Sequence, residues 1–163
     1  MSNLDVACLK CICEASTGCI ENYECNPQGF CGPFFISRKY WEEADKVTLS
    51  SDPRYREDGH EDCAKNFQCA SKIVANYMAK NGRVRIKPPR RVLHYFPPLF
   101  KFFLFFFKDC NNDGITDCDD FARIHFYGEA RCENVIENTS YHDRYITCRP
   151  PKATEDLSLL QKK

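Results

Sequence analysis

Residues 8–31 read CLKCICEASTGCIENYECNPQGFC and hold six of the twelve cysteines of this 163-residue chain. The other six follow at Cys63, Cys69, Cys110, Cys118, Cys132 and Cys148. A cytosolic chain rarely carries so many cysteines, because thiols stay reduced in the cytosol. An even number of cysteines at short spacings is typical of a small secreted domain held together by disulfides.

A zinc site is the alternative, since Cys8-x-x-Cys11 has the spacing of a zinc finger. No second Cys-x-x-Cys and no His-x-x-x-His follows at zinc-finger distance, so the sequence favours six disulfides. Full pairing would leave no thiolate to act as a nucleophile of the papain kind.

Hydrophobic periodicity predicts a helix over residues 63–80 and a second over residues 119–125. Residues 24–37 predict a hairpin that turns around Asn26-Pro27-Gln28-Gly29. After Cys148, two prolines end the fold, and we expect the polar tail 149–163 to be disordered.

The residues between the cysteines carry a family resemblance. Its motifs follow one another in order: CLKCIC at 8–13, GC at 18–19, CGPFFIS at 31–37, YW at 40–41, CA at 69–70, YM at 77–78 and FARIH at 121–125. No single motif is specific, but their order and spacing resemble the invertebrate-type lysozymes of the destabilase family over most of residues 8–148.

The resemblance implies a disulfide-rich α+β domain over residues 8–148, mostly helical with a small β-hairpin, after an N-terminal stub at 1–7. It also implies a sugar-binding cleft and hydrolysis of bacterial peptidoglycan, as a muramidase of antibacterial defence or digestion. Some members of the family are also reported to act as isopeptidases.

Hydrolysis by a lysozyme needs two carboxyl groups that flank the glycosidic bond. In the family, the general acid is a Glu three residues after the cysteine that is Cys13 here, and this position is Ser16. The second carboxylate is an Asp three residues after the equivalent of Cys25, and this position is Gln28. Neither catalytic carboxylate is retained, so the resemblance predicts weak or absent hydrolysis.

Three nearby acids could replace the lost pair. Glu14 lies two residues before Ser16, and on a helix this spacing turns a side chain by about 200°. We therefore expect Glu14 to point away from the cleft. Glu21 and Glu24 follow in a loop, where acidic side chains are usually solvated.

The substitutions at Ser16 and Gln28 leave three possible functions. The first is a lysozyme with residual or relocated activity, and the second is a non-catalytic protein that binds peptidoglycan or another glycan. The third is an isopeptidase of the destabilase type, to which no spacing of serines or lysines points directly.

Four residues could line the glycan cleft, because aromatic faces stack on sugar rings and polar tips orient hydroxyls: Tyr40, Trp41, Arg123 and His125. A place in the core is the alternative for the two aromatic residues. His125 is followed by Phe-Tyr-Gly where the family usually has Asn-Gly-Gly, so this part of the cleft departs from the family.

The resemblance also implies a pairing of the cysteines. Ala44 and Ile73 occupy the positions of a further family bridge, so both partners of that bridge are absent. The remaining pairs would be Cys8–Cys118, Cys11–Cys148, Cys13–Cys19, Cys25–Cys31, Cys63–Cys69 and Cys110–Cys132.

Residues 84–108, VRIKPPRRVLHYFPPLFKFFLFFFK, interrupt the resemblance. The apolar part, 99–107, is much shorter than the roughly 20 residues that span a membrane. We interpret the segment as a retained intron of 75 nucleotides, because a phenylalanine run encodes a pyrimidine tract before an acceptor site. Translated, it would form a disordered or aggregation-prone loop.

The first residues, MSNLDVA, lack the basic and apolar regions of a signal peptide. Since the cysteines require an oxidising compartment, we expect a secreted protein whose signal peptide is missing from this sequence. Lys and Arg balance Asp and Glu at a net charge of +0, without the excess of positive charge that holds anionic cell walls. We expect neither nucleic acid nor a membrane as a partner, and the oligomeric state is open.

Oxygen-bearing side chains at Asp109, Asn111, Asp113 and Asp120, with Gly114 at the sixth position, follow the spacing of a calcium loop. The last ligand is Asp where such loops usually have Glu, and two cysteines interrupt the pattern. The alternative is a solvated turn before the helix at 119–125, with Asp117 as its N-cap. No cofactor is required for the chemistry of the family, so calcium would be structural.

Asn138-Thr139-Ser140 is an N-glycosylation sequon. A secreted chain would carry a glycan on Asn138.

Overall fold

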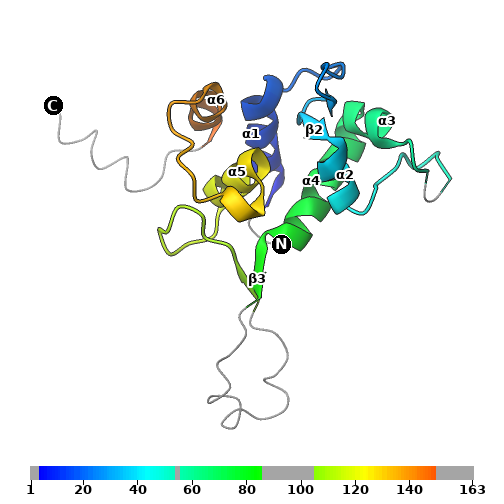
Figure 1. Ribbon diagram of the computed structural model, residues 1–163. Helices are drawn as coiled ribbons and strands as arrows, with labels where there is room; N and C mark the ends of the chain where they lie inside the picture. Colours follow the sequence, from blue (N-terminus) through cyan, green and yellow to red (C-terminus); the bar gives the residue numbers. More distant parts are fainter. Residues whose placement is uncertain (1–3, 54–55, 86–104, 150–163) are drawn as a thin grey trace, which may run out of the picture.

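The computed structural model describes residues 4–53, 56–85 and 105–149. Helices dominate these residues, and two short antiparallel strand pairs accompany them (Figure 1). The elements, in chain order, are α1 (Val6–Thr17), β1 (Phe30–Cys31), β2 (Ile36–Ser37), α2 (Arg38–Glu43), α3 (His60–Lys65), α4 (Phe67–Asn81), β3 (Arg83–Arg85), β4 (Phe105–Phe107), α5 (Cys118–Tyr127), the 3₁₀ helix η2 (Glu129–Arg131) and α6 (Ser140–Cys148). The predicted α+β class is confirmed.

Three predictions fall wholly or partly outside the described residues. The tail at 149–163 is described only at residue 149, and the interrupting segment at 84–108 only at its two ends. The N-terminal stub is described from residue 4 onward.

Helix α1 occupies the centre of the fold, with α5 and α6 on one side and α2 to α4 on the other (Figure 1). The side chain of Asp5 caps its first turn by accepting a hydrogen bond from the Cys8 amide. Gly18 ends the helix in the left-handed conformation, and its amide donates to the carbonyls of Cys13 and Glu14. The end of α1 is therefore fixed by local hydrogen bonds.

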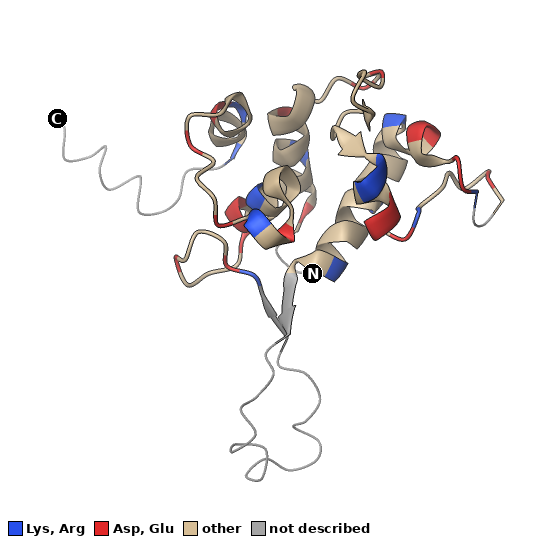
Figure 2. Cartoon of the chain, in the orientation of Figure 1, with Lys and Arg blue, Asp and Glu red and all other residues tan. Residues whose placement is uncertain are grey.

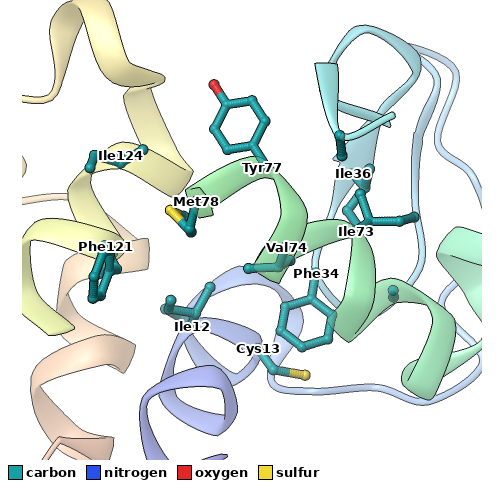
Figure 3. Close-up of a cluster of buried hydrophobic side chains, with 14 of the residues drawn as sticks. Ile12, Cys13, Phe34, Ile36, Ile73, Val74, Tyr77, Met78, Phe121 and Ile124 are labelled. Atoms are coloured by element: carbon teal, nitrogen blue, oxygen red, sulfur yellow. The ribbon is translucent and has the colours of Figure 1, made fainter. Parts of the chain in front are cut away.

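The core forms where α1, α4 and α5 meet (Figure 3). Ile12 of α1, Met78 of α4 and Phe121 of α5 have at most 1% of their surface exposed. Burial of each such side chain stabilises the fold by roughly 2 kcal/mol. This contact holds α1 and α5 together and thereby positions their C-terminal ends.

The single helix predicted over residues 63–80 is wrong in one respect, because the chain breaks it into α3 and α4 at Asn66. Asn66 has an extended conformation, with ψ 116°, and its side chain accepts a hydrogen bond from the Cys69 amide. Asparagine is among the best N-cap residues, so it starts a new helix here.

The predicted hairpin exists, but its turn lies elsewhere. Strand β1 pairs with β2, with Cys31 opposite Ile36, so the chain reverses at residues 32–35. Asn26 instead organises a separate loop, in which its side chain accepts hydrogen bonds from the amides of Gln28 and Phe30. The Asn-Pro-Gln-Gly sequence is a turn, but not the turn of the hairpin.

Gly32 is required at this reversal. Its φ is +71°, and a Cβ atom there would lie 1.7 Å from the carbonyl oxygen of Ala64. Only glycine fits such a close approach of two backbones.

Helix α5 begins one residue before the predicted start and ends two residues after the predicted end. Its N-cap is Asp117, as predicted, and Asp120 completes a capping box by accepting a hydrogen bond from the Asp117 amide. The acidic residues before α5 therefore serve to start the helix.

All described cysteines are paired. Two bridges join α1 to α5 and to α6, and a third closes residues 110–132. The other three are local, each spanning six residues. The pairs are those that the resemblance implies: Cys8–Cys118, Cys11–Cys148, Cys13–Cys19, Cys25–Cys31, Cys63–Cys69 and Cys110–Cys132.

Strands β3 and β4 lie at the two ends of the interrupting segment and pair with each other, with Arg83 opposite Phe107. The ends thus form a ladder where a loop was expected. The Lys108 amide also donates a hydrogen bond to the Gly82 carbonyl at 2.9 Å. The chain therefore leaves and re-enters the helical part at neighbouring points.

Basic and acidic residues are interspersed along the described helices, in agreement with the balanced charge of the sequence (Figure 2). None of the described helices combines the length and the apolar composition that crossing a membrane requires.

Candidate functional site

An open pocket of about 650 Å³ lies where the C-terminal ends of α1 and α5 meet the N-terminal turn of α6 and the β1–β2 hairpin. Five aromatic side chains form much of its wall: Tyr23, Phe30, Phe35, Phe126 and Tyr141. The other described lining residues are Ser16, Thr17, Gly18, His125, Ser140 and Arg144.

The aromatic wall consists of two groups. On the hairpin side, the rings of Phe30 and Phe35 stack with centroids 4.7 Å apart, and Tyr23 meets Phe35 edge-on at 5.8 Å. On the opposite side, Phe126 and Tyr141 lie with centroids 4.7 Å apart. Aromatic faces of this kind suit the apolar face of a sugar ring or another flat ligand.

Ser16 lies on the last turn of α1 and faces this pocket. Its hydroxyl donates a hydrogen bond to the Ile12 carbonyl at 2.8 Å and lies 3.3 Å from Nε2 of His125. The position expected of a general acid therefore lines the pocket, but it holds a hydroxyl whose proton is already donated to the backbone.

His125 of α5 is held from both ring nitrogens. Nε2 lies 2.9 Å from the Phe34 carbonyl, which can only accept, so Nε2 carries the proton. Nδ1 lies 3.1 Å from the Tyr40 hydroxyl, which then donates to it. Burial lowers the pKa of His125 to about 4, and the hydrogen bond to the Phe34 carbonyl only partly opposes this shift. His125 is therefore neutral near pH 7.

This arrangement does not make Ser16 a nucleophile. A serine is activated when a neighbouring histidine offers an unprotonated nitrogen to its hydroxyl. Here the nitrogen that lies near Ser16 carries the proton, and the unprotonated nitrogen of His125 faces Tyr40. The protonated Nε2 of His125 faces the oxygen of the Ser16 hydroxyl, so the contact between the two residues is structural.

Tyr40 lies behind His125 and does not line the pocket. Its ring stacks on Tyr77 of α4, with centroids 3.7 Å apart. Burial, together with Tyr77 and other neighbours, raises the pKa of Tyr40 well above its usual value. The Tyr40 hydroxyl therefore stays protonated and orients His125.

The other two predicted sugar-binding residues lie away from the pocket. Trp41 is fully buried, and its indole donates a hydrogen bond to the Val47 carbonyl, so its alternative place in the core is the one observed. Arg123 lines a separate cavity of about 140 Å³ and pairs with Glu137 at 2.7 Å. Of the four predicted residues, the structure brings only His125 to the pocket.

Among its described lining residues, the pocket has no Asp or Glu. Gln28 is exposed in the loop organised by Asn26 and does not line the pocket. Glu14 lines a different groove, between α1 and α6, as expected from its helical rotation away from Ser16. None of Glu14, Glu21 and Glu24 is among the described residues that line this pocket.

Arg144 of α6 is a lining residue that the sequence analysis missed. Its guanidinium donates to the carbonyls of Ala15 and Ser16 at the end of α1. Sequence alone offers little signal for it, since its partners lie 129 and 128 residues away.

In the predicted calcium loop, many of the carboxylate oxygens already accept hydrogen bonds from backbone amides of the same loop. Asp109 accepts from the Gly114 amide, and Asp113 from the Ile115 amide. Both oxygens of Asp120 accept backbone amides, and burial raises its pKa to about 6, although those hydrogen bonds act in the opposite direction. Over the part of the chain that is described, no three His, Cys, Asp or Glu side chains gather into a group that could hold a metal ion.

Calcium at Asp109, Asn111, Asp113 and Asp120 stays a prediction. Calorimetric titration of the folded chain with Ca²⁺ tests it, and the absence of a heat of binding at millimolar concentration would exclude it. Asn138 is exposed immediately before α6, where a glycan would not meet the core, and its glycosylation is likewise still a prediction.

Comparison with known proteins places these features in one family. The sequence model of the family described as Destabilase matches residues 5–86 and 99–148, and it leaves out part of the interrupting segment. The chain belongs to the destabilase family. This match spans α1, the hairpin, α4, α5 and α6, and thus every element that lines the pocket of this destabilase-family chain.

A lysozyme of the oyster Magallana gigas is 32% identical over 82 residues, which are 48% of this chain and 53% of that protein. The alignment thus spans about half the length of this curated relative. The crystal structure of Aeromonas hydrophila PliI in complex with Meretrix lusoria lysozyme contains a chain with the same fold, at a TM-score of 0.54 and 23% identity. That likeness covers 89% of this destabilase-family chain and 93% of the other.

Proposed function

We propose that this chain is a secreted glycan-binding protein of the destabilase family that binds bacterial peptidoglycan, or a related glycan, without hydrolysing it efficiently. One observation carries the proposal: the described lining of the pocket at Ser16 contains aromatic and hydroxyl side chains but no carboxylate. The pocket keeps the means to hold a sugar and lacks the means to cleave its bond.

Hydrolysis of a glycoside requires a proton on the leaving oxygen and a carboxylate beside the oxocarbenium-like centre. Ser16 cannot protonate a leaving group near neutral pH. His125 cannot replace it, because its pKa of about 4 leaves it neutral at pH 7, with its single proton held against the Phe34 carbonyl. No described side chain in the pocket supports either catalytic role.

An isopeptidase reaction at this pocket lacks support from the same geometry. Such a reaction needs a nucleophile and a base, and the unprotonated nitrogen of His125 faces Tyr40, away from Ser16. We therefore favour binding over both hydrolytic alternatives.

The proposal that the chain is secreted rests on its disulfides and on its relatives. Six bridges are typical of proteins that fold in an oxidising compartment, and the oyster relative is a lysozyme. An antibacterial or a digestive role would follow from binding of cell walls, and both belong to the proposal.

The test compares the full, oxidised chain with the double variant Ser16→Glu, Gln28→Asp on Gram-positive cell walls. Sedimentation with insoluble peptidoglycan measures binding, and loss of turbidity measures lysis. We expect both proteins to sediment with the walls. We expect the parent to leave the turbidity of the walls unchanged. Lysis by the parent would overturn the loss of catalysis, and failure of both proteins to sediment would overturn glycan binding.

The lysis expected of the double variant depends on where its two restored carboxylates lie. Glu at position 16 would face the pocket from the last turn of α1, whereas Gln28 is exposed outside it. We therefore expect the double variant to gain at most a small part of lysozyme activity, because only one of the two restored carboxylates reaches the pocket.

A further inference from the structure

We propose that the pocket at Ser16 selects glycans that carry a carboxylate. This inference rests on the proposed function and names its ligand class. A pocket that cleaves glycosides by two acids is negatively charged and stabilises a cationic centre. Here Arg144 is the only charged side chain among the described lining residues, since His125 is neutral near pH 7. Among the described lining residues, the pocket therefore carries one positive charge and no negative charge.

The guanidinium of Arg144 is fixed in place while part of it stays available. Nε and Nη2 donate to the Ala15 carbonyl at 2.8 and 2.6 Å, and Nη2 also lies 3.2 Å from the Ser16 carbonyl. The contacts of the described residues assign no partner to Nη1, and none of their ion pairs involves Arg144. A guanidinium held in this way presents its remaining N–H groups with little loss of side-chain entropy.

The backbone around Arg144 adds to the same effect. The N-terminal turn of α6 reaches the pocket through Ser140 and Tyr141, and the start of a helix carries a partial positive charge. The end of α1, which carries the opposite partial charge, also borders the pocket. Four carbonyls near this end already accept hydrogen bonds, because those of Cys13 and Glu14 accept from the Gly18 amide and those of Ala15 and Ser16 accept from Arg144.

The nearby acids do not enter the pocket. Glu14 and Asp143 line the neighbouring groove between α1 and α6, which Arg144 also lines. A carboxylate on a bound sugar would therefore meet Arg144 and the start of α6, while its ring lies against the aromatic wall. Charge-assisted hydrogen bonds of this kind are stronger than those that neutral hydroxyl groups make.

The experiment is calorimetric titration of the full, oxidised chain with two tetrasaccharides. Chitotetraose is neutral, and the hyaluronan tetrasaccharide has the same length and also contains N-acetylglucosamine but carries two carboxylates. We expect hyaluronan to bind about tenfold more tightly, which corresponds to one good charge-assisted hydrogen bond. The preference should shrink as salt is added, because salt screens exposed charges.

Three variants assign the preference to Arg144. Arg144→Gln should abolish the preference for hyaluronan over chitotetraose, while Arg144→Lys should retain part of it. Arg131→Gln is the matched control, since Arg131 is exposed on η2 and outside the pocket. Circular dichroism confirms that each variant is folded.

The outcomes distinguish failure of this inference alone from failure of the proposed function. Equal binding of both tetrasaccharides, or a preference that survives in Arg144→Gln, would overturn the selection of carboxylates and leave glycan binding intact. Failure of both tetrasaccharides and of peptidoglycan to bind would overturn the proposed function together with this inference.

Discussion

Arg144 on α6 donates two hydrogen bonds to the carbonyl oxygen of Ala15 on α1, at 2.8 and 2.6 Å. The two residues are 129 positions apart in the chain. The contact adds two capped carbonyls to the C-terminal end of α1, beside those that the Gly18 amide caps. It also sets the side of the pocket on which positive charge lies.

The first prediction concerns the stability that this contact provides. Arg144→Ala leaves two carbonyls without their donor, and we expect the free energy of unfolding to fall by about 1 kcal/mol, since the side chain is exposed and water partly replaces it. Chemical denaturation with the disulfides intact measures it. Arg131→Ala serves as control and should change stability by less than about 0.5 kcal/mol. Equal stability of the two variants would mean that the contact contributes nothing.

The second prediction uses two glycines that both have positive φ. Gly32→Ala forces a Cβ to within 1.7 Å of the Ala64 carbonyl, whereas the same change at Gly29 meets no atom within 4 Å. We expect Gly29→Ala to cost about 1 kcal/mol for backbone strain alone. Gly32→Ala should cost about 3 kcal/mol or more, because the hairpin must move away from α3. Thermal unfolding of the two variants measures the difference, and similar melting temperatures would contradict the close approach.

The third prediction is a pH dependence that arises from His125. Its pKa is about 4 in the folded chain against 6.5 for an ordinary histidine. Between these values the unfolded chain binds more protons, so this residue makes stability fall as the pH is lowered from about 6.5 to about 4. We expect the loss to be roughly 2 kcal/mol.

The raised pKa of Asp120 acts in the opposite direction over a similar range, so the wild-type profile alone does not isolate His125. The measurement is therefore the difference between the wild type and His125→Gln, by urea unfolding at pH 7 and pH 4.5. The wild type should lose more stability than the variant on acidification, and parallel profiles would refute the shifted pKa.

The fourth prediction concerns residues 84–108. Because the Lys108 amide contacts the Gly82 carbonyl, removal of the segment brings together points that are already neighbours. We expect the shortened chain to fold with all six disulfides and an unchanged melting temperature. Sequencing of the transcript across codons 83–109 tests the intron hypothesis separately: a mature message without the 75 nucleotides would support it, and one that keeps them would refute it.

Local sequence features predicted much of the fold. The helix of residues 67–81 and the cap at Asp117 follow from periodicity and from N-cap preference. The bridges followed from the order of motifs between the cysteines, which one sequence cannot convert into pairs without a related pattern. The turn of the hairpin was placed wrongly, because Asn26 makes a local loop that resembles a hairpin turn in sequence.

The candidate site was harder to predict, since its walls come from four parts of the chain. Ser16 and His125 were found through the motifs that contain them, and both line the pocket. Trp41 was placed in the cleft although its ring is fully buried, because an aromatic residue gives the same signal in a core and in a binding site. Arg144 was missed, since its role depends on a carbonyl of α1 that packing alone brings near.

The arrangement of the bridges has a consequence for how this chain survives proteases. Cys8–Cys118 encloses every peptide bond from residue 8 to residue 118, and Cys11–Cys148 encloses those from residue 11 to residue 148. A single cut anywhere between Cys8 and Cys148 therefore releases no fragment. The nicked protein would keep its full mass on a non-reducing gel and come apart only after reduction, so an intact band is no proof of an intact backbone.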